Sequence, residues 1–229
     1  MLKPVWGRIY LLWKTGKNKE INFVEKMVDN SVIDYLLSIY NAQRVHINIS
    51  FSDILIYFQR YEVLIKAWNY RWNLVSAGEV ENLWKKHLIP SLKPLERDLI
   101  PWGAKCLDAG AGAGFPGLPI RFFRRDLVLT LIDSRRKKTL FLQKAREELG
   151  LEGLTIIRGR VEEMAERFDV VFSRALGKPE VVTPLLRTRL NPGGKLLLWT
   201  ARKERVDLLE QEAEEMDIEG GGKLVILGI

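Results

Sequence analysis

Cysteine, histidine and long apolar runs are all scarce in this sequence of 229 residues. The single cysteine, Cys106, cannot form an internal disulfide, which agrees with a reducing compartment. The two histidines, His46 and His87, lie far from each other and from Cys106 and lack metal-ligand spacing, so we expect no metal. No run approaches the ~18 apolar residues of a membrane helix, and the run at 9–13 is too short for a signal peptide. We therefore expect a cytoplasmic protein that does not span a membrane.

The composition predicts a folded, basic protein. Apolar residues make up 47%, which is ample for a buried core and excludes a disordered chain. The net charge of +7 favours a polyanionic partner without locating its binding site. Basic runs at 121–125 and 135–138 are expected on helices that flank the site described below. They are either solvated helix faces or contacts for a polyanionic substrate.

The most informative stretch is 106–117, CLDAGAGAGFPG. A short apolar run ends at Asp108, and Gly110, Gly112 and Gly114 follow at alternate positions. This order predicts a strand, a tight turn and a helix N-terminus, where the backbone can approach a ligand closely. Dinucleotide-binding folds carry G-x-G-x-x-G instead, which disfavours a nicotinamide-dependent oxidoreductase. The G-x-G-x-G spacing resembles motif I of S-adenosylmethionine-dependent methyltransferases; the alternative is a glycine-rich turn that binds nothing.

From residue 104 onward strands and helices alternate, which is typical of an α/β fold with a parallel, Rossmann-like sheet. The last strand, which follows three glycines, is expected to be an antiparallel edge. Ligands in such sheets lie at the carboxyl ends of the strands. We expect strands at 104–109, 127–132, 154–158, 169–173, 194–200 and 223–228, and helices at 116–125, 135–149, 178–190 and 203–216.

The chain before this domain is expected to be helical. Residues 1–30 show no clear period and form an N-terminal extension; residues 31–103 form a helical cap, and 104–229 the α/β domain. One cap helix begins near Ser31, a second is capped by Ser52, and a third follows Gly78. His87 in the third helix and Cys106 in the first strand are both expected to be packed rather than catalytic.

Three strand ends supply candidate site residues. Asp133 ends the second strand and can accept the ribose hydroxyls of an adenosine, or it can cap the next helix. Val161 and Glu162 follow the third strand, where they would lie against an adenine or simply begin a helix. Arg174 ends the fourth strand and can contact a phosphate or a base, or form a salt bridge.

Several stretches together resemble one family, the small-subunit (16S) ribosomal RNA guanine-N7 methyltransferases, also called glucose-inhibited division protein B. The Gly-Phe-Pro-Gly and Ser-Arg-Ala sequences are the most specific of them. The stretches are 68–69, 73–75, 84–88 with His87, 108–117, 131–134, 160–163, 168–169 and 173–175. The sequence departs from the family at Pro90-Ser91, where an Asp usually precedes the Ser, and at Thr200-Ala201, where Lys-Gly is common.

The resemblance implies an N-terminal helical cap on a methyltransferase domain, with S-adenosylmethionine as cofactor and small-subunit ribosomal RNA as partner. It implies methylation of guanine N7, and it implies that the donor touches Gly110, Phe115, Asp133, Val161, Glu162 and Arg174. The glycine turn adds Asp108, Gly112 and Gly114 to the candidate donor site. We expect a monomer, and our hypothesis is that Arg174 is the catalytic residue that orients the substrate or the carboxylate of the donor. Two other functions fit the same features: methylation of a small molecule, and RNA binding without catalysis.

Overall fold

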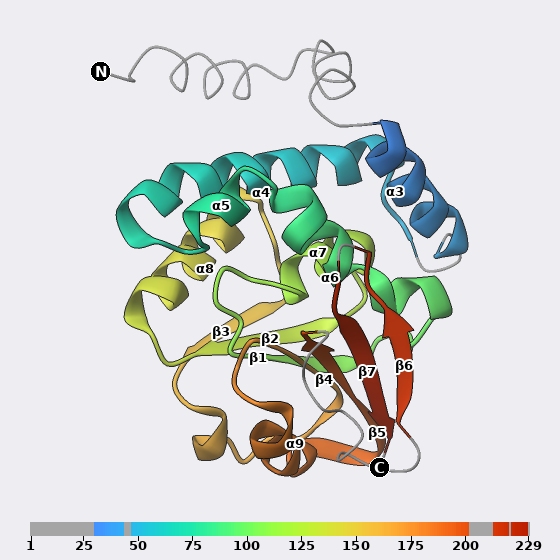
Figure 1. Cartoon of the computed structure of the whole chain (residues 1–229), viewed down its shortest axis with the longest axis vertical. Coiled ribbons are helices and arrows are strands. Elements are labelled where there is room, and N and C mark those ends of the chain that lie inside the picture. The colour runs from blue at the N-terminus through green and yellow to red at the C-terminus, as the bar shows by residue number, and fades with distance from the viewer. Residues whose placement is uncertain (1–29, 44–46, 202–212, 220, 229) are drawn as a thin grey trace.

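The computed structural model describes residues 30–43, 47–201, 213–219 and 221–228 (Figure 1). Three predictions therefore concern residues outside the described part: the N-terminal extension before residue 30, His46, and the helix expected at 203–216 over its first ten residues.

The centre of the fold is a seven-stranded sheet with the order β3-β2-β1-β4-β5-β7-β6. Strands β1 to β5 pair in parallel, and β7 is antiparallel to both β5 and β6. The strand order reverses between β1 and β4, so their carboxyl ends mark the place where such sheets bind ligands. The strands are β1 (Lys105–Ala109), β2 (Val128–Asp133), β3 (Leu154–Arg158), β4 (Phe168–Arg174), β5 (Leu190–Thr200), β6 (Glu214–Asp217) and β7 (Lys223–Gly228). The predicted α/β fold is confirmed.

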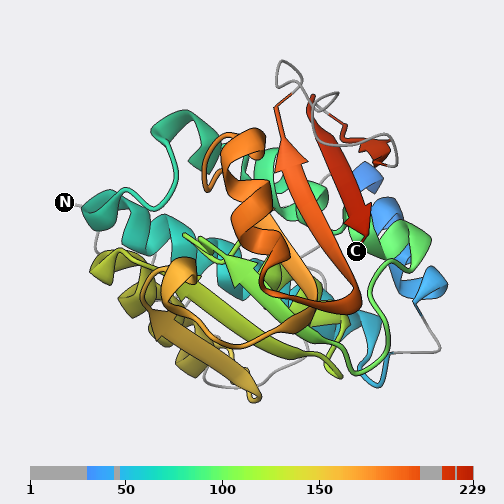
Figure 2. The same ribbon diagram turned by 90° about the horizontal axis from the view of Figure 1, so that it is seen from below.

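Helices cover both faces of the sheet. In β1, Cys106 packs into the core beneath the cap, whereas Leu107 and Ala109 pack into a second core on the other face, as the period of two in a strand requires. Figure 1 shows α7 (Gly117–Phe123) and α8 (Arg136–Glu148) on the cap side and α9 (Pro179–Arg187) on the opposite side, and α9 lies in front of the sheet in the view from below in Figure 2. The core on the cap side runs without a break from cap residues to sheet residues. The predicted domain boundary at 103/104 stays a prediction.

The first two cap helices form as predicted, apart from one cap residue. Helix α3 spans Asn30–Ala42, and α4 spans Phe51–Trp72 and crosses above α7 and α8 (Figure 1). The predicted N-cap, Ser52, is wrong: Ser50 caps α4, because its extended backbone lets Oγ accept the Asp53 N–H at 3.1 Å.

The third cap helix is not continuous. The chain instead forms four short pieces, and the two prolines in this stretch, Pro90 and Pro94, lack the N–H that a continuous helix requires. The pieces are α5 (Ala77–Val80), a π-helical turn η2 (Trp84–Leu88), α6 (Ile89–Ser91) and a 3₁₀ turn η3 (Lys93–Arg97).

The predicted end of the domain needs three corrections. Strand β5 begins at Leu190 rather than 194, and the preceding helix ends at Arg187. Residues 214–216, expected to be helical, lie in β6. Strand β7 is antiparallel as expected but is not the edge strand, because β6 pairs along its outer side. The glutamate-rich sequence favours a helix, but here Glu215 forms an ion pair with Lys223 of β7.

Candidate functional site

The glycine turn after β1 lies where the sheet order reverses. Gly110, Gly112 and Gly114 all have positive φ (72°, 58° and 96°), which explains the glycines at these positions. The amides of Gly110 and Ala111 donate to the Ile132 carbonyl at 2.9 and 3.0 Å, so the turn is fixed to the end of β2. A Cβ added at Gly112 would meet only the Gly110 carbonyl, at 3.7 Å. The turn is therefore open above Gly112, as a cradle for a ligand must be.

Asp133 lies beside this open turn. Its Oδ2 accepts the Gly112 N–H at 3.0 Å, and its Oδ1 accepts the Arg135 N–H at 2.8 Å. The alternative role as helix N-cap is not observed, because Arg135 is the N-cap of α8. A carboxylate has about four lone-pair sites, so two remain for other donors. The side chain is thus held in place and can accept hydroxyl groups of a ligand.

Asp108, a candidate donor-binding residue, lies beneath the glycine turn rather than beside its open side. Its side chain is fully buried beneath the turn, where Oδ2 accepts the Gly117 N–H at 2.8 Å. Within the described part of the chain, Oδ1 has no hydrogen-bond partner. Desolvation on burial raises the pKa of Asp108 to about 7. Asp108 supports the start of α7 from below, and its contact with a donor stays a prediction.

Val161 and Glu162 lie on a 3₁₀ turn η4 (Val161–Glu163) after β3. Val161 is buried in the second core, on the face of the sheet opposite the cap, whereas Glu162 is exposed. This segment is adjacent to the glycine turn, because the Gly159 N–H donates to the Asp133 carbonyl at 3.3 Å. An apolar wall and a carboxylate are thus brought to the same edge of the sheet.

Arg174 points from the end of β4 into the cap. Its Nη2 donates to the Lys86 carbonyl at 2.5 Å and its Nη1 to the His87 carbonyl at 3.4 Å. In a continuous α-helix the amide of residue 90 would donate to the Lys86 carbonyl, but Pro90 has no N–H. The proline that departs from the family pattern therefore leaves an acceptor for Arg174. Desolvation on burial lowers the pKa of Arg174 to about 10, so the guanidinium is charged at neutral pH.

His87 joins the cap to the glycine turn, a contact that sequence reasoning missed. The prediction that it is packed is confirmed, since it is 9% exposed. Its ring stacks on Phe115 with centroids 4.8 Å apart and planes at 19°, and Phe115 also contacts Tyr61. Burial lowers the pKa of His87 to about 4, so the imidazole is neutral at pH 7. Cys106 is buried as expected, and desolvation raises the pKa of its thiol.

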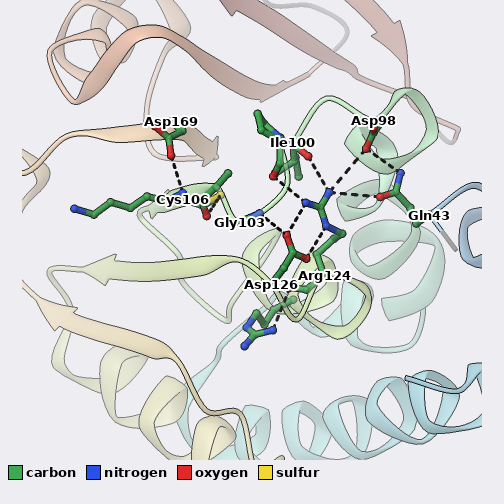
Figure 3. Close-up of polar contacts among 12 residues, drawn as sticks. Gln43, Asp98, Ile100, Gly103, Cys106, Arg124, Asp126 and Asp169 are labelled. Carbon is green, nitrogen blue, oxygen red and sulfur yellow. Dashed lines mark hydrogen bonds and ion pairs between the residues drawn. The ribbon is translucent and has the colours of Figure 1, made fainter. Parts of the chain in front are cut away.

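The first basic run is neither a solvated helix face nor a contact for a polyanion at Arg121 and Arg124, because both side chains are buried. Figure 3 shows Arg124 surrounded by Gln43, Asp98, Ile100 and Asp126. The Arg124 side chain is fully buried; its Nη2 and Nε contact the Asp126 carboxylate at 2.7 and 2.8 Å, and its Nη1 donates to the Ile100 carbonyl at 2.8 Å. Ile100 precedes β1, and Arg124 and Asp126 precede β2, so the cluster lies at the amino ends of these strands, away from the glycine turn.

The second basic run lies next to the site. Arg135, Arg136 and Lys137 are exposed directly after β2, close to Asp133. Lys138 is buried and donates to the Leu74 carbonyl of the cap. Three cations are therefore available on the surface at the carboxyl edge of the sheet.

Comparison with known proteins gives the family. The sequence matches the family described as rRNA small subunit methyltransferase G over residues 55–227. The chain belongs to this family. Ribosomal RNA small subunit methyltransferase G of Streptococcus pneumoniae serotype 19F (strain G54) is 38% identical over 160 residues, which cover 67% of this chain and 68% of that protein. The protein of the same name from Streptococcus gordonii shows the same identity and coverage. The resemblance stated from the motifs is confirmed.

Solved structures agree on the fold. A SAM-dependent methyltransferase from Aquifex aeolicus has a TM-score of 0.52 at 17% identity and covers 69% of this chain and 95% of that chain. A ribosomal protein L11 methylase from Lactobacillus delbrueckii subsp. bulgaricus has a TM-score of 0.51 at 13% identity, with 65% and 79% covered. The family matched here is thus consistent with a methyltransferase fold. Over the ranges that the structure describes, no helix is long and apolar enough to cross a membrane.

Proposed function

We propose that this protein transfers a methyl group from S-adenosylmethionine to guanine N7 of small-subunit (16S) ribosomal RNA. The observation that carries the proposal is the hydrogen bond between the Gly112 amide and Asp133. This bond holds a carboxylate beside an open glycine turn, at the point where the strand order reverses, and we expect the carboxylate to accept the ribose hydroxyls of the donor. Membership of the rRNA small subunit methyltransferase G family supports the RNA substrate.

The residues present fit the proposed donor. Gly112 lets the turn approach a ligand closely, whereas the Leu176 side chain occupies the space beside Gly110. Asp133 keeps free lone pairs, and Val161 and Glu162 lie on the adjacent turn. When bound, S-adenosylmethionine supplies an electrophilic methyl group on a sulfonium. Arg174, which is held by two cap carbonyls, would orient the substrate or the donor carboxylate.

The chemistry of guanine N7 requires no general base. Guanine N7 has an in-plane lone pair and needs no deprotonation before it attacks. Catalysis can then consist mainly of orientation and exclusion of water. His87 is neutral and buried, and Arg174 is charged, so neither is suited to remove a proton at pH 7.

Charge at the carboxyl edge of the sheet favours a large polyanion over a small molecule. Exposed cations follow β2 and β3 and also lie on the cap, whereas Arg124 at the opposite edge is buried. Contacts with phosphates release counterions, so RNA binding should weaken steeply as salt rises. The exposed cations are Lys85, Lys86, Arg135, Arg136, Lys137, Arg158 and Arg160.

The test begins with calorimetric titration of S-adenosylmethionine, with NADH as the control ligand. We expect binding of the methyl donor alone, followed by transfer of a tritiated methyl group to 16S ribosomal RNA or to the small subunit. Asp133→Ala should weaken donor binding without unfolding the chain. If the protein binds the donor but transfers the methyl group to a small molecule at a rate that does not depend on salt, RNA is not the substrate. If it binds RNA but not the donor, it is not a methyltransferase.

A further inference from the structure

We propose that Glu79 of the cap recognises the target guanine, with its carboxylate accepting hydrogen bonds from the base N1–H and the 2-amino group. This inference rests on the proposed function, because it concerns how the same site binds the Watson–Crick edge of the guanine that is methylated. It adds a specificity-determining residue that the glycine turn and the strand ends do not contain.

Glu79 is held in place before any substrate arrives. It lies on α5, where its Oε2 accepts the Ser76 N–H at 3.1 Å and the Ser76 hydroxyl at 2.6 Å. These hydrogen bonds lower the pKa of Glu79, so it is ionised at neutral pH. Its side chain is 43% exposed, so a ligand can reach it. The acceptor is therefore charged, ordered and accessible.

The second oxygen of Glu79 faces an unsatisfied group. Its Oε1 lies 3.7 Å from His87 Nε2, which is too far for a hydrogen bond. His87 Nε2 is buried and has no hydrogen-bond partner in the described ranges. Buried polar atoms are usually paired, so an orphan at this position indicates that the cluster is completed by a ligand. Arg174 and Lys86 are the charged groups that act electrostatically on this pair.

The cap segment that carries Glu79 is fixed relative to the glycine turn. His87 stacks on Phe115 of the turn, and Arg174 at the end of β4 binds the carbonyls of Lys86 and His87. The cap segment next to Glu79 is thus held by one ring stack on the glycine turn and by two hydrogen bonds from a single guanidinium at the end of β4. A base that contacts Glu79 is held at the rim of the site where the donor is proposed to bind.

The chemistry of the bases makes a carboxylate selective for guanine. Guanine presents two adjacent donors, N1–H and the 2-amino group, on its Watson–Crick edge. Ser76 uses both lone pairs of Glu79 Oε2, so Oε1, which has two free lone pairs, is the oxygen that accepts from the base. Adenine presents an acceptor at N1, which a carboxylate repels. N7 lies on the other edge of the guanine ring and stays free to take the methyl group. The positive charge that develops on the methylated ring is also stabilised by a nearby carboxylate.

The experiment compares RNA carrying guanosine at the mapped methylation site with RNA carrying inosine there, since inosine lacks only the 2-amino group. For the wild-type enzyme we expect kcat/KM to fall about tenfold or more with inosine, as for loss of a hydrogen bond to a charged group. For Glu79→Ala we expect a low kcat/KM on guanosine and little further loss on inosine. Donor affinity, measured by calorimetry, should stay within about twofold of wild type in this variant.

Two matched variants separate recognition from folding. Ser76→Ala removes the hydroxyl contact but keeps the backbone N–H contact and the carboxylate, so it should retain the preference for guanosine. Glu81→Ala removes an exposed acid on the same segment and should behave as wild type. If Glu79→Ala does not fold, Glu79→Gln keeps an acceptor for Ser76 and should still show a reduced preference. A wild-type preference in the Glu79 variants would overturn the inference alone. Absence of methyl transfer by the wild-type enzyme would instead overturn the proposed function.

Discussion

The imidazole of His87 lies face to face with the ring of Phe115, with centroids 4.8 Å apart. One ring belongs to a π-helical turn of the cap and the other to the glycine turn after β1. The stack joins two parts of the chain that are separate in sequence. The conformation of the glycine turn therefore depends on the cap.

Replacing this ring should therefore affect both stability and donor binding. Aromatic pairs contribute about 0.5–1.5 kcal/mol beyond their buried area. We expect His87→Ala to lower the free energy of unfolding by about 1–3 kcal/mol and to weaken donor binding several-fold, because the loop loses its support. His87→Phe keeps the stack and should restore most of both. Urea denaturation and calorimetry measure the two effects; equal losses in the two variants would show that stacking is unimportant.

Asp108 should make the protein less stable as the pH rises. Its pKa in the folded state is about 7, above its value of 3.8 without burial, so the folded state binds more protons between these values. Stability then falls as pH increases from about 4 to about 7, by an amount on the order of 2–4 kcal/mol. Asp108→Asn keeps an acceptor for the Gly117 amide and should remove this slope. The difference between the two unfolding curves, measured without donor, isolates Asp108; identical pH slopes would contradict the assignment.

Loss of the Arg174 guanidinium should reduce turnover more than stability. The side chain is held by the carbonyls of Lys86 and His87, so its removal misplaces the cap relative to β4. We expect Arg174→Ala to lower methyl transfer roughly a hundredfold in single-turnover assays, as for small misplacements of catalytic groups. Arg174→Lys keeps the charge but not the geometry and should recover only part of this. Wild-type activity in Arg174→Ala would exclude the role.

Two arginines from the two basic runs should behave in opposite ways. Arg124 is buried, and its removal leaves Asp126 and the Ile100 carbonyl without their partner. We expect Arg124→Met to lower the free energy of unfolding by about 3–5 kcal/mol. Arg136 is exposed beside the site, so Arg136→Met should change stability by less than about 0.5 kcal/mol.

Salt titrations complete this comparison. If Arg136 contacts a phosphate, its replacement should reduce the slope of the logarithm of the RNA association constant against the logarithm of the salt concentration by about one. Arg124→Met, measured at a temperature at which it is folded, should keep the wild-type slope. An unchanged slope in Arg136→Met would show that the RNA binds to a different surface of the protein.

The sequence indicates local features well because stereochemistry fixes them. Gly110, Gly112 and Gly114 occupy positive-φ positions, and Asp133 ends its strand as predicted. Patterns that depend on distant partners are misleading. Arg124 belongs to a basic run typical of a surface, yet residues from three parts of the chain bury it.

Dependence on distant partners also explains why the sequence does not predict strand β6 or the contacts of His87. The sequence at 214–216 favours a helix locally, and only pairing with β7 makes it a strand. The contact of His87 with Phe115 comes from the packing of the cap on the glycine turn, and its contact with Glu79 joins two short pieces within the cap. Contacts of this kind depend on tertiary structure, which a periodic pattern does not contain.

The most direct test of the central claim is to locate the methyl group. Ribosomal RNA from small subunits that lack the modification is incubated with the enzyme and S-adenosylmethionine, and the product is digested to nucleosides for mass spectrometry. Borohydride reduction followed by aniline cleavage then breaks the RNA only at N7-methylated guanosines. The account predicts one new N7-methylguanosine and cleavage at one position. Methylation at any other atom, or none in the presence of bound donor, would contradict it.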